Sequence, residues 1–176
     1  MALPGEKTHG AEYAAEAITR GAVAVLTDAA GAAKISGVPV IVSSNPRRAA
    51  GVISAWFDSE PMRDLYSVGV TGTNGKTTTT LMLESILLAA GKRTVAAGNI
   101  GRSLVEVVMD PTPWDVLAIE VGAPQLPFVH SISPQAAVCL NLAQDHIDLF
   151  GTFEAYRDAK AKVYERCQVA AIFNVA

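Results

Sequence analysis

The chain has 176 residues, of which 50% are hydrophobic and 18% are charged, so it can bury a core and is not a disordered tail. The formal net charge of −3 argues against a general nucleic-acid-binding protein, which would usually be basic. That charge still allows a local basic pocket for one phosphorylated ligand.

The N-terminal stretch MALPGEKTHG has no apolar core, so no signal peptide is predicted. No apolar run reaches the roughly 18 residues that a membrane-spanning helix needs. Cys139 and Cys167 belong to no CxxC pair or Cys/His cluster, and we expect both to be buried, reduced thiols. These features predict a cytoplasmic protein.

The first part of the chain alternates between helix and strand signals, which predicts a partial α/β domain over residues 1–60. Asn45 followed by Pro46 is a typical N-cap and first-turn pair and predicts the start of a helix. The polar stretch 59–65, with Pro61 in its middle, is the predicted linker. The expected elements are helices over 11–20 and 45–57, strands over 22–27 and 38–43, and a turn-rich connection over 28–37.

A second partial domain is predicted over residues 61–176. Its apolar segments are rich in valine, isoleucine and alanine and alternate with helices, which predicts a mainly parallel sheet covered on both faces. The fold class is therefore α/β. The expected strands are 66–71, 93–98, 114–121, 135–142 and 169–175, and the expected helices are 77–91, 102–110 and 153–167.

The stretch TGTNGKTT at 71–78 joins a predicted strand to a predicted helix, which is the context of a phosphate-binding loop. Glycines let backbone N–H groups approach phosphate oxygens, and the helix N-terminus adds partial positive charge. Lys76 would reach the β- and γ-phosphates, and the Thr77 hydroxyl would bind Mg²⁺. The generic GxxxxGK[ST] pattern fits imperfectly, because Val70 stands where its first glycine should be. The predicted nucleotide-binding residues are Gly72, Thr73, Asn74, Gly75, Lys76, Thr77 and Thr78.

Further polar residues follow two other predicted strands, at the sheet edge that carries this loop. Glu120 ends the strand over 114–121, where a carboxylate can bind Mg²⁺. His146 comes just past the next strand, beside Asp145, and is a second candidate ligand. Lys160 and Lys162 lie on the helix that follows, and their positions alone also fit two solvated surface lysines.

The loop TGTNGKTT after an apolar strand resembles the ATP loop of the Mur ligases, the ATP-dependent amino-acid-adding enzymes of peptidoglycan synthesis, and thus of cell wall biogenesis, cell shape and cell division. The family motif DH.D…Y…AK is similar to Asp145, His146, Asp148, Tyr156, Ala159 and Lys160 here. This resemblance implies that Lys160 is carbamylated and helps to hold a second Mg²⁺. It also implies that Asn99, in the segment GNIG, lies close to the acyl substrate and the phosphate.

The reaction that the resemblance implies is a two-step amide synthesis. A substrate carboxylate attacks the γ-phosphate of ATP to give an acyl phosphate, which the amine of the incoming amino acid then attacks. The implied catalytic residues are Lys76, Glu120, His146 and Lys160, and the implied metal ligands are Thr77, Glu120, His146 and Lys160.

The two halves of the chain resemble different members of the family. Residues 1–80 are similar to the ligase that adds diaminopimelate or lysine to UDP-N-acetylmuramoyl-L-Ala-D-Glu. Residues from 94 onward are similar to the ligase that adds D-glutamate to UDP-N-acetylmuramoyl-L-alanine. A chimera, a recombined gene or a divergent homologue would each produce this split.

Mur ligases have three domains. The resemblance therefore implies a partial UDP-muramoyl-binding domain, an incomplete P-loop-type central domain and a missing C-terminal domain. Three functions stay open: a ligase acting on a UDP-muramoyl-peptide and an amino acid, a catalytically silent fragment that still binds ATP and Mg²⁺, and a relative of the folylpolyglutamate synthetases, which carry a similar loop. The segments HGAEYA and GNIG argue against the third. After Glu120 the family's Ser-Ser is replaced by Val121-Gly122, a change that concerns the substrate more than the nucleotide.

Overall fold

The chain divides into two compact units, Met1–Asp58 and Ser59–Ala176. The polar stretch 59–65 that predicts the linker lies partly outside the described residues. None of the described helices is long and apolar enough to cross a lipid bilayer. The computed structural model describes residues 1–5, 7–57, 59 and 64–175.

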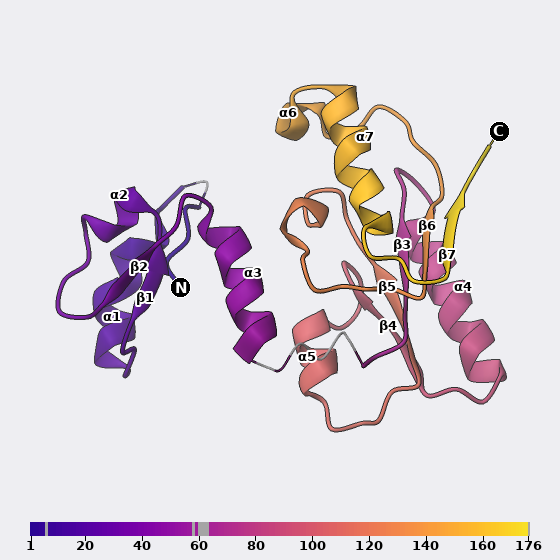
Figure 1. Cartoon of the computed structure of the whole chain (residues 1–176), viewed down its shortest axis with the longest axis horizontal. Helices are drawn as coiled ribbons and strands as arrows, with labels where there is room; N and C mark the ends of the chain where they lie inside the picture. The colour runs from indigo at the N-terminus through magenta and orange to yellow at the C-terminus, as the bar shows by residue number, and fades with distance from the viewer. Residues whose placement is uncertain (6, 58, 60–63, 176) are drawn as a thin grey trace. The chain divides into compact units, whose positions relative to one another are not determined.

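The first unit contains a two-stranded parallel sheet flanked by short helices (Figure 1). Its elements are η1 (Gly10–Tyr13), α1 (Ala14–Thr19), β1 (Val25–Thr27), α2 (Ala29–Ala32), β2 (Val40–Val42) and α3 (Pro46–Phe57). β1 and β2 pair in a register that sets Val25 opposite Val40. Ala2, Ala11 and Val25 form a small buried core, which other partly buried side chains cover.

Two parts of this unit differ from the prediction. The turn-rich connection over 28–37 contains α2, because the Asp28 carboxylate accepts a hydrogen bond from the Gly31 N–H at 2.7 Å and caps that helix. The helix predicted over 11–20 opens with the 3₁₀ turn η1, where the His9 Nδ1 accepts from the Ala11 N–H at 3.0 Å. The His9 ring also lies 3.1 Å from the Asp28 carboxylate, so the residues that cap η1 and α2 contact each other.

The second unit is a five-stranded parallel sheet with the strand order β4-β5-β3-β6-β7 (Figure 1). Because every pairing is parallel, the carboxyl ends of the central strands β5, β3 and β6 lie at one edge of the sheet. The strands are β3 (Ser67–Thr71), β4 (Thr94–Gly98), β5 (Val116–Glu120), β6 (Ala136–Cys139) and β7 (Ala170–Phe173). The helices are α4 (Lys76–Ala89), α5 (Leu104–Met109), η3 (Leu126–Phe128), α6 (Ile147–Phe150), α7 (Phe153–Ala161) and η4 (Lys162–Tyr164). The predicted α/β fold class with a mainly parallel sheet is confirmed.

Three details of this unit correct the prediction. The helix over 153–167 divides into α7 and η4, and the short helix α6 was not predicted. Of the two thiols expected to be buried, Cys139 is buried but Cys167 is partly exposed.

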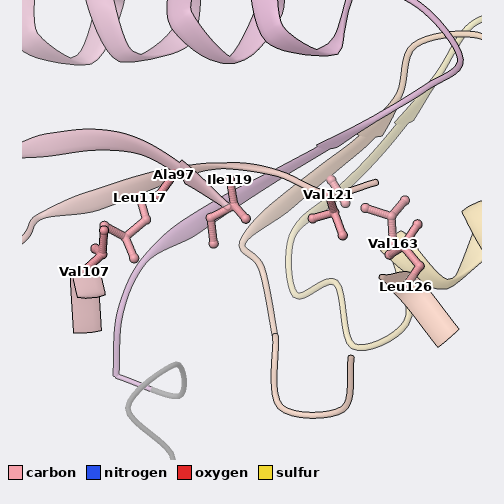
Figure 2. Close-up of a cluster of buried hydrophobic side chains, with 8 residues drawn as sticks. Ala97, Val107, Leu117, Ile119, Val121, Leu126 and Val163 are labelled. Atoms are coloured by element: carbon pink, nitrogen blue, oxygen red, sulfur yellow. The ribbon is translucent and has the colours of Figure 1, made fainter. Parts of the chain in front are cut away.

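The core of this unit is centred on β5, the strand that ends at Glu120. Figure 2 shows Leu117 and Ile119 of this strand among the buried side chains, with Val107 of α5 next to Leu117. Leu117, Ile119 and Val107 are each fully buried. Burying each such side chain stabilises the folded state by about 1.5–3 kcal/mol. The core therefore fixes the position of β5, and with it the carboxylate that follows at its end.

Candidate functional site

The loop between β3 and α4 turns sharply at Gly75. This residue is the N-cap of α4 and has a φ of +79°, a left-handed conformation that glycine adopts without steric cost. Asn74, Gly75 and Thr77 are exposed, whereas Gly72 is buried against the sheet. The start of α4 is therefore exposed at the edge of the sheet. Its first N–H groups have no acceptor within the helix.

Two lysine side chains converge on the carbonyl oxygen of Gly72. Lys76 Nζ donates to Gly72 O and Thr73 O, both at 3.0 Å, and Lys160 Nζ donates to Gly72 O at 2.7 Å. Lys160 is 2% exposed and lies 4.9 Å from the centre of the Tyr156 ring. Burial, followed by the positive charge of Lys76, lowers the pKa of the Lys160 ammonium to about 8. Two cations at one loop make this edge of the sheet favourable for an anion.

The Glu120 carboxylate connects the loop helix to the segment GNIG. Thr77 Oγ1 donates to Glu120 Oε2 at 2.8 Å, and Asn99 Nδ2 donates to Glu120 Oε1 at 3.0 Å. Glu120 is 2% exposed and stands opposite both Val70 and Gly98 in the sheet register. A buried carboxylate is stable only with partners, and these two donors supply them.

The oxygen atoms of Thr77 and Glu120 are a donor set that fits Mg²⁺, which prefers carboxylate and hydroxyl or water oxygens. Within the described residues, no three histidine, cysteine, aspartate or glutamate side chains gather into a metal site of their own.

A cavity of about 210 Å³ lies between these groups. It brings together five of the sequence-predicted site residues. Glu120 does not line it but accepts a hydrogen bond from Asn99, which does. Thr77 and Thr78 line a separate hollow on α4 with Leu81 and Met82, although Thr77 donates to Glu120. The predicted residues that line the cavity are Gly72, Lys76, Asn99, His146 and Lys160.

His146 reaches the cavity from the N-terminal end of α6 in a left-handed backbone conformation, with a φ of 51°. Its Nε2 lies 3.5 Å from the carboxylate of Asp145, which also lines the cavity. A neutral imidazole beside a carboxylate can serve as a metal ligand or as a hydrogen-bond partner for an anionic ligand.

Sequence reasoning did not assign a role to two residues that hold the loop. Tyr156 is fully buried, and its hydroxyl lies 2.9 Å from Thr73 Oγ1. Asn141 makes side-chain hydrogen bonds to the backbone of Thr73 and Asn74. The signal for Asn141 was its place just past the end of a buried strand, at the edge that carries the loop.

Comparison with known proteins agrees with this geometry. Residues 70–176, more than half of the chain, match the model of the Mur ligase middle domain. The UDP-N-acetylmuramoylalanine--D-glutamate ligase of Leifsonia xyli is 48% identical over 112 residues, which cover 61% of this chain and 22% of that protein. The ligase of the same name from Streptomyces coelicolor is 51% identical over 109 residues, covering 62% and 23%. The chain thus spans about a quarter of the length of these relatives.

Two solved structures share the fold at lower sequence identity. The MurF ligase from Thermotoga maritima, in complex with ADP, has a TM-score of 0.67 and 22% identity, over 98% of this chain and 41% of that one. A UDP-N-acetylmuramoyl-L-alanyl-D-glutamate--2,6-diaminopimelate ligase has a TM-score of 0.75 and 22% identity, over 94% and 38%. E. coli FolC, in complex with DHPP and ADP, is a weaker match, with a TM-score of 0.52 and 20% identity over 72% of this chain and 46% of that one. With a family model that covers most of the chain and D-glutamate ligases as its relatives, this protein belongs to the Mur ligase family.

Proposed function

We propose that this chain forms the ATP-binding part of a Mur ligase that joins an amino acid to a UDP-N-acetylmuramoyl-peptide through an acyl phosphate. The observation that carries this proposal is the convergence of Lys76, Lys160 and the Thr77–Glu120 pair around the loop after β3. The curated relatives favour D-glutamate as the added amino acid. Because the loop is proposed to use ATP, we place the reaction in the cytoplasm.

In this proposal the loop residues Gly72–Thr78 bind the phosphates of ATP. Lys76 exchanges its two loop carbonyl partners for phosphate oxygens and stabilises the negative charge of the transferring phosphoryl group. Glu120 and Thr77 would hold Mg²⁺, which supplies further positive charge at the β- and γ-phosphates when bound. Asn99 keeps the Glu120 carboxylate in place and faces the cavity, where the acyl substrate would lie.

Lys160 and His146, which both line the cavity, are proposed to serve a second Mg²⁺. A lysine reacts with CO₂ only as the neutral amine: its nitrogen bonds to carbon, a proton leaves, and an anionic carbamate results. The lowered pKa of Lys160, about 8, makes the amine available near neutral pH and supports this assignment. The carbamate would replace the positively charged ammonium of Lys160 with an anionic group whose oxygens can bind a metal.

Titration calorimetry with ATP and Mg²⁺ tests the nucleotide part of the proposal. Lys76→Ala is expected to weaken binding by about 10- to 150-fold, since hydrogen bonds to charged groups contribute about 1.5–3 kcal/mol. Lys92→Ala, at an exposed position just past the same helix, is the matched control and should bind as the wild type does. Equal binding by Lys76→Ala and wild type would overturn the assignment of the loop.

Phosphate release tests the ligase part. The wild-type chain is mixed with ATP, UDP-N-acetylmuramoyl-L-alanine and D-glutamate, and separately with the dipeptide precursor and diaminopimelate. Release in the first mixture alone supports the D-glutamate-adding reaction. ATP binding without phosphate release in either mixture would support the catalytically silent alternative. The specific observation behind that alternative is that this chain covers 22–23% of the length of its relatives.

A further inference from the structure

The side chain of Asn141 makes three hydrogen bonds to the first half of the nucleotide loop. Its Oδ1 accepts from the Thr73 N–H at 3.1 Å and from the Asn74 N–H at 2.9 Å. Its Nδ2 donates to the Asn74 carbonyl at 3.0 Å. Because Asn141 follows directly on β6, which ends at Cys139, these bonds tie the loop to the sheet.

These bonds divide the amides of the loop into two groups. The N–H groups of Thr73 and Asn74 point at the Asn141 side chain and are already paired. The N–H groups at the start of α4 have no acceptor inside the helix, whose first turn closes with the Thr79 N–H donating to Gly75 O at 3.0 Å. The second group is available to a phosphate, and its direction depends on how the first half of the loop is held.

Other contacts hold the same part of the loop. Thr73 Oγ1 donates to the Ala143 carbonyl at 3.2 Å, accepts from the Ala143 N–H at 3.0 Å and lies 2.9 Å from the Tyr156 hydroxyl. The Asn141 side chain is the one that bonds the backbone N–H groups of both Thr73 and Asn74, so a substitution can remove those contacts while the main chain of β6 stays paired.

We propose that Asn141 is a positioning residue for nucleotide binding: it fixes residues 73–74 to the end of β6 so that the amides at the start of α4 keep the arrangement that a phosphate requires. This inference rests on the proposed ATP-binding function of the loop. A neutral amide suits the position, because an aspartate would offer the same acceptor oxygen but would add a negative charge next to a polyphosphate.

Amide hydrogen exchange, followed residue by residue by NMR without nucleotide, tests the tie itself. In Asn141→Ala, the Asn74 N–H loses its acceptor and should exchange at least about fivefold faster than in the wild type. The Thr73 N–H should change less, because it also lies 3.2 Å from the main-chain oxygen of Asn141 and keeps that acceptor. In Asn141→Asp, which keeps the acceptor oxygen but loses the Nδ2 donor to the Asn74 carbonyl, the Asn74 N–H should exchange more slowly than in Asn141→Ala.

Calorimetric titration with ATP and Mg²⁺ tests the consequence. Asn141→Ala should bind about three- to tenfold more weakly, as expected for the loss of ordinary hydrogen bonds. Asn141→Asp should also bind more weakly, although its loop is tied, and its deficit should shrink with added salt because screening weakens charge repulsion. Gln168→Ala is the matched control, because it removes an exposed side-chain amide that donates to Ser133 O at 3.0 Å and not to the loop. This variant should leave ATP affinity unchanged.

Two results overturn the inference: equal Asn74 exchange in the wild type and Asn141→Ala, or wild-type ATP affinity in an Asn141→Ala variant that has lost this protection. If Asn141→Ala does not fold, Asn141→Asp decides. A protected Asn74 N–H with a salt-sensitive loss of ATP affinity supports the inference, and an unprotected one overturns it. A wild-type chain that binds no ATP refutes the proposed function, whereas the exchange measurement still tests the tie.

Discussion

Lys76 and Lys160, which are 84 positions apart in the sequence, donate hydrogen bonds to the same carbonyl oxygen of Gly72, at 3.0 and 2.7 Å. One lysine comes from the first turn of α4 and the other from the last turn of α7. Two ammonium groups that share one acceptor repel each other, so an anion placed between them is attracted by both and relieves their repulsion.

Glu120 is expected to control the response of nucleotide binding to Mg²⁺. Glu120→Gln keeps an oxygen that can accept from Thr77 but loses the negative charge that attracts a divalent cation. We expect the gain in ATP affinity on adding Mg²⁺ to fall about tenfold, whereas binding in EDTA changes little. Calorimetry with and without Mg²⁺ measures this. Glu154→Gln, at an exposed position on α7, is the control, and an undiminished Mg²⁺ effect in Glu120→Gln would contradict the prediction.

Lys160 is expected to form a carbamate whose amount increases with pH. Its pKa of about 8 means that the neutral amine becomes the main form as the pH rises through 8. Incubation with ¹³C-bicarbonate should give a carbamate signal in the ¹³C NMR spectrum that Lys160→Arg lacks. A signal that persists in Lys160→Arg would show that another amine is modified.

The same shift makes the stability of the fold depend on pH. Lys160 has a pKa of about 8 in the folded chain and its ordinary value of 10.5 in the unfolded chain, so between these values the unfolded chain binds more protons. The free energy of unfolding should therefore rise with pH from about 8 to 10.5, as the cost of burying the charge disappears. Denaturant unfolding at several pH values measures the slope, which Lys160→Met should flatten. A slope equal in both proteins would assign the effect to other groups.

The hydroxyl pair of Thr73 and Tyr156 should contribute to stability as a unit. Tyr156→Phe removes one partner of a bond of 2.9 Å and is expected to cost about 1 kcal/mol. Thr73→Val also removes the two bonds of this hydroxyl to the main chain of Ala143 and is expected to cost more. The double variant should cost less than the sum, with a coupling of about 0.5–1 kcal/mol. Urea unfolding of the four proteins measures it. Tyr66→Phe, at an exposed tyrosine, is the control, and strict additivity would mean that the hydroxyls act independently.

Gly98 should be the least replaceable glycine near the site. It has a φ of +103°, and a Cβ there would lie 2.3 Å from the main-chain oxygen of Glu120. Gly91 also has a positive φ, +74°, but a Cβ there meets nothing within 4 Å. Gly91→Ala should therefore cost only the backbone strain of about 1 kcal/mol.

Gly98→Ala should cost at least about 2 kcal/mol more than Gly91→Ala and should also displace Glu120 and Asn99. Thermal unfolding and Mg²⁺-dependent ATP binding together measure both effects. Equal stability of the two variants would show that the strands can separate enough to admit the methyl group.

The sequence predicted the elements whose signals are local. The helix after Gly75 and the strand before Glu120 could be placed because apolar periodicity and glycine punctuation lie within a few residues. The helix α2 was missed because the small residues around Gly31 look like a turn, and a single side-chain cap decides between the two. The split of the last helix at Ala161 likewise has no strong breaker residue in the sequence.

The site could be predicted only as a set of residues at one sheet edge. That edge follows from parallel strands, so Glu120 and the loop could be expected to meet, and their hydrogen bond is present. The strand order, the shared acceptor of the two lysines and the bonds of Asn141 depend on long-range pairing that no local pattern encodes. The Ala96 N–H of the edge strand β4 donates a hydrogen bond to Glu84 Oε1 of α4, and this long-range contact could not be predicted from a local pattern either.

The strand that carries the loop occupies the middle of its sheet, and both of its neighbours are encoded downstream. β3 ends at Thr71, whereas β5 and β6 end at Glu120 and Cys139. On the ribosome, the glycine loop is therefore made before either strand that supports it. Its ability to bind a nucleotide should arise late during translation, after β6 and Asn141 have emerged.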